Sequence, residues 1–183
     1  MNFKYLWTFM LCLLVLGAPR LRGQTLELQV KAAFIEKFTH FIEWPPLSQN
    51  KTYSDTFRVL ILGESPLTPL IEANFKKSPP PSFKHFLIVK GNEVEVNDYY
   101  HLIYISPSFK VKLEEVLSIT AGKPILTIGD TEGYGQRGVI INLYKAGETI
   151  RFEVNYQSLQ RSSLNVSSRL LKLARILNWS EVP

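Results

Sequence analysis

The segment Val139-Ile140-Ile141-Asn142-Leu143-Tyr144 and the segment Thr149-Ile150-Arg151-Phe152-Glu153-Val154-Asn155 decide the fold class of this chain. Both are rich in β-branched and aromatic residues, and residues 145–148 between them suit the turn of an antiparallel hairpin. Because side chains alternate across a strand, we expect Phe152 and Val154 to face the core. The same alternation predicts that Arg151, Glu153 and Asn155 face outward.

Four further strands are predicted upstream of this hairpin, at residues 57–62, 83–89, 102–105 and 124–128. Segments that suit helices separate them, at residues 66–76 and from Ser106-Pro107, which resembles an N-cap followed by proline, to Gly122. Strands separated by helices favour parallel pairing. We therefore predict one α/β domain, with a mixed, mostly parallel sheet of about six strands and helices on both faces.

An apolar stripe predicts a helix of about 16 residues at the start of this domain. Its members recur at three- and four-residue spacing: Leu26, Val30, Ala33, Phe34, Phe38 and Phe41. Trp44 follows and precedes two prolines, which push the residue before them out of the helical conformation. The Trp44 ring is expected either to pack in the core or to line a shallow apolar groove as a binding anchor.

Residues 1–23 have the features of a secretory signal peptide, with Lys4 before an apolar stretch and Gly23 as a small residue before a cut. We expect cleavage there, with residues 24–183 forming the exported domain. The alternative is an uncleaved signal anchor, because Arg20 and Arg22 lie unusually close to the cut.

Removing this segment changes the charge of the chain. It carries three basic residues and no acidic one, so the net charge falls from +5 to +2. Such a small excess does not favour a nucleic-acid partner. The single cysteine, Cys12, also lies in the segment, so the domain must be stabilised by its core rather than by disulfides.

Motifs for chemistry are sparse. Gly133-Tyr134-Gly135-Gln136-Arg137-Gly138 has the spelling of a dinucleotide-binding loop, but a predicted strand follows it where the motif requires a helix. We expect a glycine-rich turn there and no cofactor. The three histidines are far apart, with no zinc-site spacing. We therefore predict no metal site and no catalytic residue.

Asp130 follows a predicted strand, at a position where open α/β sheets often place ligand-binding groups. The alternative, which we prefer, is an aspartate that caps a turn. Near the end of the chain, residues 164–174 suggest a basic amphipathic helix with Arg169, Lys172 and Arg175 at every third position. This basic stripe is either an ordinary solvated face or a docking edge for an acidic partner.

Several segments resemble the YfiR-like family of small bacterial envelope regulators. Residues 30–38 leading to 41–45 are similar to the family's opening helix and its Trp-Pro stop, and residues 99–106 to its third strand. Residues 130–144, 151–155 and 164–174 also fit. These ordered blocks span nearly the whole exported domain, which makes the resemblance more specific than any single motif.

The resemblance implies a periplasmic protein without catalysis. Members of the family bind the periplasmic part of an inner-membrane diguanylate cyclase and repress it, which lowers cyclic-di-GMP and restrains biofilm formation; others accompany histidine kinases. A homodimer is possible. The candidate partner- or ligand-binding residues are Trp44, Asp130, Arg151, Glu153, Asn155 and Arg169.

Two other functions stay open. A small-ligand receptor, serving a kinase or a transporter, predicts a deep pocket near Gly63, Ser106 and Asp130, at the carboxyl ends of the strands. An envelope hydrolase would need an acid–base pair, for which the sequence offers no candidate. Many relatives carry a cysteine where this chain has Tyr100, so redox control through disulfides is not expected here.

Overall fold

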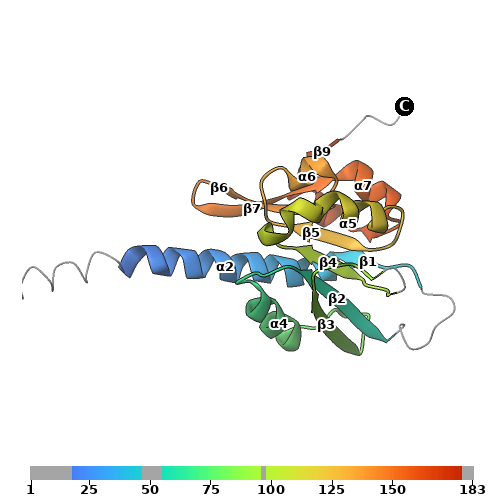
Figure 1. The fold of residues 1–183 in the computed structure, drawn as a ribbon, viewed down its shortest axis with the longest axis horizontal. Helices are drawn as coiled ribbons and strands as arrows, with labels where there is room; N and C mark the ends of the chain where they lie inside the picture. The colour runs from blue at the N-terminus through green and yellow to red at the C-terminus, as the bar shows by residue number, and fades with distance from the viewer. Residues whose placement is uncertain (1–17, 47–54, 96–97, 179–183) are drawn as a thin grey trace, which may run out of the picture.

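The computed structural model describes residues 18–46, 55–95 and 98–178 (Figure 1). Most of the predicted signal peptide lies outside these ranges. Its predicted end, after Gly23, falls inside the first described helix, α2 (Ala18–Phe38). None of the helices in the described ranges is both long enough and apolar enough to span a membrane.

In the described part of the chain, seven strands form one sheet in the order β3-β2-β4-β5-β6-β7-β9. Only the β6–β7 hairpin is antiparallel, and every other neighbouring pair is parallel. The strands are β3 (His85–Gly91), β2 (Thr56–Leu62), β4 (Leu102–Ile105), β5 (Leu126–Gly129), β6 (Ile141–Ala146), β7 (Thr149–Asn155) and β9 (Arg175–Leu177).

Helices cover both faces of this sheet, as predicted (Figure 1). One face packs against α2 and α4 (Thr68–Lys77), and the other against the 3-10 helix η2 (Pro107–Lys112), α5 (Leu113–Thr120) and α6 (Tyr134–Arg137). In β2, Val59 and Ile61 point to the first core while Leu60 and Leu62 point to the second. Strands buried on both sides read as continuous apolar runs, which is why the α/β class could be predicted.

A two-stranded ribbon joins the two ends of the domain. After the 3-10 helix η1 (Thr39–Phe41), β1 (Ile42–Glu43) pairs antiparallel with β8 (Asn165–Val166). The turn after β7 is the short helix α7 (Tyr156–Arg161), and α8 (Ser168–Leu171) follows β8. The extended backbone before the Trp44 prolines thus becomes a strand rather than a loop.

The predicted C-terminal helix is wrong. Residues 164–174 hold β8 and the four-residue α8, and the chain then forms β9 along the open edge of β7. Ser163, just before this segment, has a left-handed φ of 59°, and the Ser167 side chain caps α8, so that a helix begins only at Ser168. Arg169, Lys172 and Arg175 therefore do not form one helical stripe.

The glycine-rich segment is a single helical turn, α6, rather than the simple turn that the sequence predicts. Gly133 and Gly138 flank it with φ values of 83° and 118°, conformations that favour glycine. A helix of four residues is too short to cradle a phosphate through its dipole. Its role is structural, as its contacts with β7 show below.

Candidate functional site

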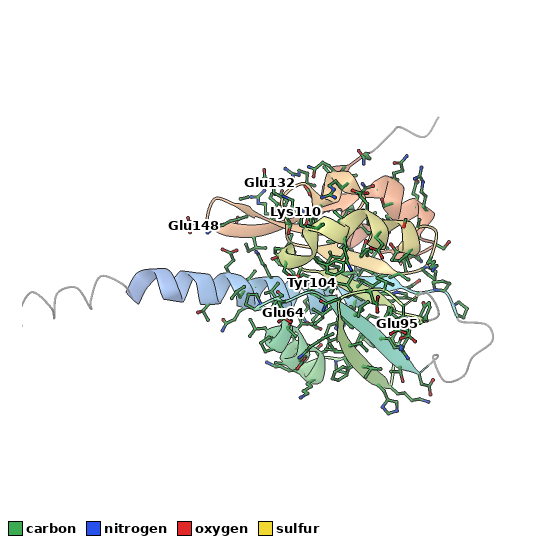
Figure 2. All side chains as sticks on the ribbon, viewed as in Figure 1. Glu64, Glu95, Tyr104, Lys110, Glu132 and Glu148 are labelled. Carbon is green, nitrogen blue, oxygen red and sulfur yellow. The ribbon has the colours of Figure 1, made fainter. Side chains whose placement is uncertain are left out.

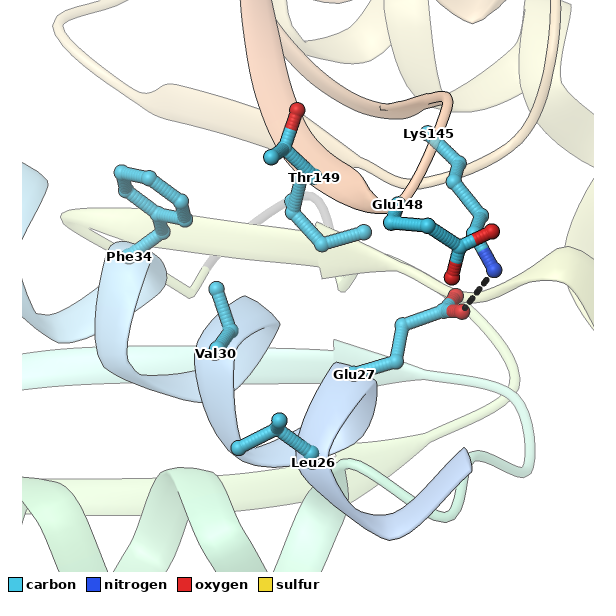
Figure 3. Close-up of a pocket in the computed structure, with 8 residues that line it drawn as sticks. Leu26, Glu27, Val30, Phe34, Lys145, Glu148 and Thr149 are labelled. Atoms are coloured by element: carbon cyan, nitrogen blue, oxygen red, sulfur yellow. Dashed lines mark ion pairs between the residues drawn. The ribbon is translucent and has the colours of Figure 1, made fainter. Parts of the chain in front are cut away.

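An open groove lies between the middle of α2 and the β6–β7 hairpin (Figure 1). Its volume is about 380 Å³. Figure 3 shows the residues that line this α2–hairpin groove: Leu26, Glu27, Val30 and Phe34 from α2, and Lys145, Glu148, Thr149 and Ile150 from the hairpin. Figure 2 shows Glu148 at the hairpin tip, beside the mouth of the groove.

The wall supplied by α2 is apolar. Leu26, Val30 and Phe34 follow one another at four-residue spacing, so they share one face of the helix. Aromatic rings close the base of the groove. The centre of the Phe34 ring lies 5.7 Å from the centre of the Phe38 ring and 5.9 Å from that of Phe152. The mouth is open, and Leu26 keeps 61% of its surface exposed.

The helix α2 therefore has two apolar faces. Ala32, Ile35 and Phe38 are fully buried against the sheet, whereas Leu26, Val30 and Phe34 of the predicted apolar stripe line the groove. Because these side chains leave apolar surface open to water, they indicate an interaction surface.

A polar chain of contacts fixes α2 to the sheet beside the groove. Lys31 Nζ donates to Asp130 Oδ2 at 3.1 Å and lies 3.0 Å from Glu27 Oε1. Tyr104, labelled in Figure 2, donates its hydroxyl to Asp130 Oδ1 at 2.8 Å. Glu27 Oε2 lies 3.5 Å from Lys145 Nζ, the ion pair drawn in Figure 3. We call Glu27, Lys31, Tyr104, Asp130 and Lys145 the Lys31 network.

Charge compensation holds this network together. Burial alone would lower the pKa of the Lys31 ammonium, but the Asp130 and Glu27 carboxylates together outweigh that effect and raise it. The hydrogen bond from Lys31 lowers the pKa of Glu27. Burial, followed by repulsion from Asp130, raises the pKa of the Tyr104 phenol, so it remains a donor. The position of the groove's helical wall thus depends on a buried ammonium.

Asp130 belongs to this network rather than to an open ligand site. Its side chain keeps 7% of its surface and is engaged by Lys31 and Tyr104. We preferred, from the sequence, an aspartate that caps a turn, and the structure does not show that role either. The Asp130 side chain instead joins α2 to the carboxyl end of the sheet.

The prediction that Glu153 and Asn155 face outward is wrong, because α6 covers that face of β7. Both residues are almost fully buried, with 1% and 2% exposure. Glu153 accepts hydrogen bonds from Asn142 Nδ2 at 3.0 Å and from the Arg175 guanidinium. Asn155 Nδ2 donates to the Gly135 carbonyl at 2.8 Å, and a Cβ at Gly135 would collide with the Glu153 carboxylate. These residues dock α6 and β9; Phe152 and Val154 face the core as predicted.

Arg151 is exposed, as expected, but on the hairpin face opposite the groove, because its neighbour Ile150 lines the groove. Arg169 is exposed at the β1–β8 ribbon, where it lines a cavity of about 370 Å³ with His40 and Glu43. The candidate residues are thus spread over separate parts of the domain, and only Glu153 and Asn155 lie close together.

Trp44 is half-buried and belongs to the packing around the core. Its Nε1 donates to the His101 carbonyl at 3.0 Å, and its ring lies edge-on to Phe57 at 5.0 Å. This placement agrees with the core alternative for its ring. His101 is also buried, and its Nδ1 accepts a hydrogen bond from the Arg58 backbone at 3.0 Å.

Burial of His101 makes the stability of the domain depend on pH. Burial, with a smaller contribution from Arg58, lowers the pKa of His101 to about 4. Between pH 4 and the unfolded value the unfolded chain binds a proton that the folded chain does not, so stability falls with acidification. From pH 7 to pH 5 we expect a loss of about 2 kcal/mol in the free energy of unfolding. Urea titrations at the two pH values measure it.

The control for this pH effect is His101→Gln, whose side chain does not titrate but can still accept the Arg58 hydrogen bond. Its unfolding free energy should change less over the same interval. An equal pH dependence in the two proteins would show that another group is responsible.

At the carboxyl ends of β2 and β3 there is a half-open polar cavity of about 360 Å³, lined by Gly63, Ser65, Thr68 and Lys90 among others. Ser106 lies beside it but is fully buried, with its Oγ 2.7 Å from Ser108 Oγ. The pocket predicted for a small-ligand receptor therefore includes Gly63 only. Within the described ranges, no three His, Cys, Asp or Glu side chains gather as a metal site.

Sequence reasoning missed Glu27, which lines the groove, and Lys31, which lies beside the groove and pairs with Glu27. The four-residue spacing of Glu27 and Lys31 indicates an ion pair within a helix. The second partner of Lys31, Asp130, is 99 residues away in sequence, so no local pattern indicates it. The hairpin residue Ile150 was assigned to a strand without a site, since nothing local shows that its hairpin overhangs the sheet.

Comparison with known proteins identifies the family. The model of the YfiR/HmsC-like family matches residues 28–175, from the middle of α2 to the start of β9. This chain belongs to the YfiR/HmsC-like family. Members of this family are regulators rather than enzymes, and membership implies interaction with a membrane signalling protein. No curated protein matches the chain.

A solved structure supports the fold. The chain is similar to the ABC domain from Streptococcus pneumoniae, determined in complex with L-Trp, with a TM-score of 0.54 and 9% sequence identity. The likeness covers 80% of this chain and 60% of that chain. At this identity it confirms an α/β architecture and nothing about ligands.

Proposed function

We propose that this protein is a periplasmic regulator that binds an inner-membrane signalling protein, in the first place a diguanylate cyclase, and represses it. Repression lowers cyclic-di-GMP and restrains biofilm formation. The signal peptide at residues 1–23 would deliver the chain to the periplasm. The observation that carries the proposal is the open apolar wall of α2 in a member of a family of regulators.

The α2–hairpin groove is the surface proposed for this contact. Leu26, Val30 and Phe34 offer a row of apolar side chains two helical turns long, and Ile150 faces them from the hairpin. Apolar side chains of a partner helix can be buried between such walls, at 3- and 4-residue spacing. Glu27, Lys145 and Glu148 form a polar rim that fixes orientation.

Repression requires a preference between two states of the partner. A regulator changes its partner's equilibrium only if it binds one conformation more tightly, and each tenfold preference corresponds to about 1.4 kcal/mol. Cleavage after Gly23 would start the exported chain at Gln24, so the groove-lining Leu26 lies next to the new N-terminus. The partner contact then depends on residues that follow the cleavage site directly.

Leu26→Glu, alone and with Val30→Glu, tests the groove. In a strain whose gene is deleted, intracellular cyclic-di-GMP should rise, and the wild-type gene should restore it. We expect the Leu26→Glu protein to fail, because a charge in the apolar wall weakens the contact by tenfold or more, about 1.4 kcal/mol. Leu26 is exposed, so the fold should tolerate the change.

The matched control is Leu173→Glu, which places the same charge on another exposed leucine outside the groove. It should restore normal cyclic-di-GMP. Restoration by both variants would exclude the groove as the contact surface. Unchanged cyclic-di-GMP after deletion, with crosslinking in the envelope to a histidine kinase alone, would exclude the cyclase as the partner.

A second candidate function is a small-ligand receptor, and the polar cavity at the ends of β2 and β3 favours it. Open α/β sheets bind ligands at the carboxyl ends of their strands, where the strand order reverses, which here is between β2 and β4. The serines after β4 fill the centre of that position, so only its side toward β3 is open.

A further inference from the structure

A separate cleft lies at the opposite, amino-terminal ends of β5 and β6. It has a volume of about 190 Å³ and is bounded by α5, α6 and α7. We call it the amino-end cleft. It is formed by residues at the amino-terminal ends of these two strands and by three helices, and the proposed partner contact does not involve it. Its chemistry differs from that of the α2–hairpin groove.

The charged side chains that line the amino-end cleft are both arginines. Arg137 comes from the end of α6 and Arg161 from the end of α7, and none of the described acidic residues lines the cleft. Arg137 also pairs with Glu114, through Nε and a terminal nitrogen, each 2.9 Å from Oε1, but Glu114 is 68% and Arg137 37% exposed, so a ligand can compete with this surface pair. Two cations without a lining acid favour an anionic ligand.

A buried hydroxyl supplies a second, independent observation. Thr127 is 2% exposed and lines the cleft, and its Oγ1 accepts a hydrogen bond from the Ile140 backbone at 2.9 Å. That contact uses a lone pair and leaves the hydroxyl hydrogen without an acceptor among the described residues. Because buried donors are costly when unpaired, this hydroxyl points to a ligand oxygen in the cleft.

The other walls are apolar. Leu117, Ile125 and Ile140 contribute hydrocarbon surface to the same cleft. Its volume is below the range of drug-sized sites, roughly 300–1,000 Å³, so the ligand must be small. An arginine guanidinium matches a carboxylate with two parallel hydrogen bonds. We propose that the amino-end cleft binds a small organic carboxylate, with its charge at Arg137 and Arg161 and its apolar body against the three aliphatic side chains.

Calorimetric titration of the purified protein with benzoate tests this site. We expect saturable binding of benzoate and none of benzamide, the neutral compound of the same shape. Arg161→Gln should weaken benzoate binding at least tenfold. Arg161 is exposed, so the variant should fold, which circular dichroism verifies.

The matched control is Arg151→Gln, which removes the same charge from an exposed arginine on the hairpin, outside the cleft. It should bind benzoate like the wild type. Equal binding of benzamide and benzoate, or an unchanged affinity in Arg161→Gln, would overturn the proposal. So would a lack of saturable benzoate binding, even if inorganic phosphate binds, since phosphate has no apolar body.

Discussion

Replacing Lys31 with methionine should lower the free energy of unfolding by about 4 kcal/mol, because it leaves a buried carboxylate without its cation. The Asp130 side chain keeps 7% of its surface, and in the variant the Tyr104 hydroxyl would be its remaining side-chain donor among the described residues. Glu27 loses its closer partner as well and keeps the ion pair with Lys145 at 3.5 Å. Urea denaturation of wild type and variant at neutral pH measures the difference.

A double variant and a control variant test this interpretation. Lys31→Met combined with Asp130→Asn removes the buried charge as well, so part of the lost stability should return. Lys84→Met breaks an ion pair of similar length, 2.9 Å to Asp55, between exposed side chains, and should leave stability nearly unchanged. Equal losses in Lys31→Met and Lys84→Met would show that the Lys31 network does not hold α2.

The second large effect is expected at Arg175. Arg175→Met should lower the free energy of unfolding by about 3 kcal/mol, because it removes the cation from the buried Glu153 carboxylate. The remaining donor to Glu153 is Asn142 Nδ2. The Arg175 guanidinium also lies 4.3 Å from the centre of the Tyr144 ring, and that contact is lost too. Thermal and urea unfolding report the change.

For Arg175, the informative companion variant is Arg175→Met with Glu153→Gln. A neutral amide still accepts the Asn142 hydrogen bond, so the double variant should be more stable than Arg175→Met alone. Arg137→Met, which breaks an exposed pair with Glu114, serves as the control for loss of an arginine. If Arg175→Met lowers the free energy of unfolding no more than Arg137→Met does, the fold does not depend on the ion pair between Glu153 and Arg175 of β9.

The strands were predictable from local pattern because the sheet is buried on both faces. Residues 57–62 and 102–105 are short apolar runs bounded by turns, and the hairpin turn at residues 145–148 is set by its own glycine, with φ of 61° at Gly147. Each of these signals depends on neighbours in sequence. Their order along the chain then determines the α/β class.

Elements fixed by distant partners could not be predicted in this way. Arg175 is at three-residue spacing from Lys172, which suits a helix, yet it forms a strand because β7 offers an open edge and Glu153 a buried charge. Glu153 and Asn155 alternate with apolar residues, which normally places polar side chains outside. They are buried because α6, whose glycines suggested only a turn, covers them.

The apolar residues of one wall of the groove were predictable from the sequence, but the groove itself was not. The apolar stripe that contains Leu26, Val30 and Phe34 was predicted, but its partner was not, because periodicity gives the face of a helix and not what covers it. Where the hairpin ends relative to α2 depends on strand register across the sheet. The site therefore required the tertiary structure, although each of its apolar residues was already in the predicted pattern.

The edge position of β9 has a consequence for biogenesis. Glu153 emerges 22 residues before Arg175 during synthesis, so a growing chain holds an acidic group that its interior cannot yet accept. The ion pair that neutralises Glu153 can therefore form only after the chain has been synthesised through β9, the last strand of the sheet along the described sequence.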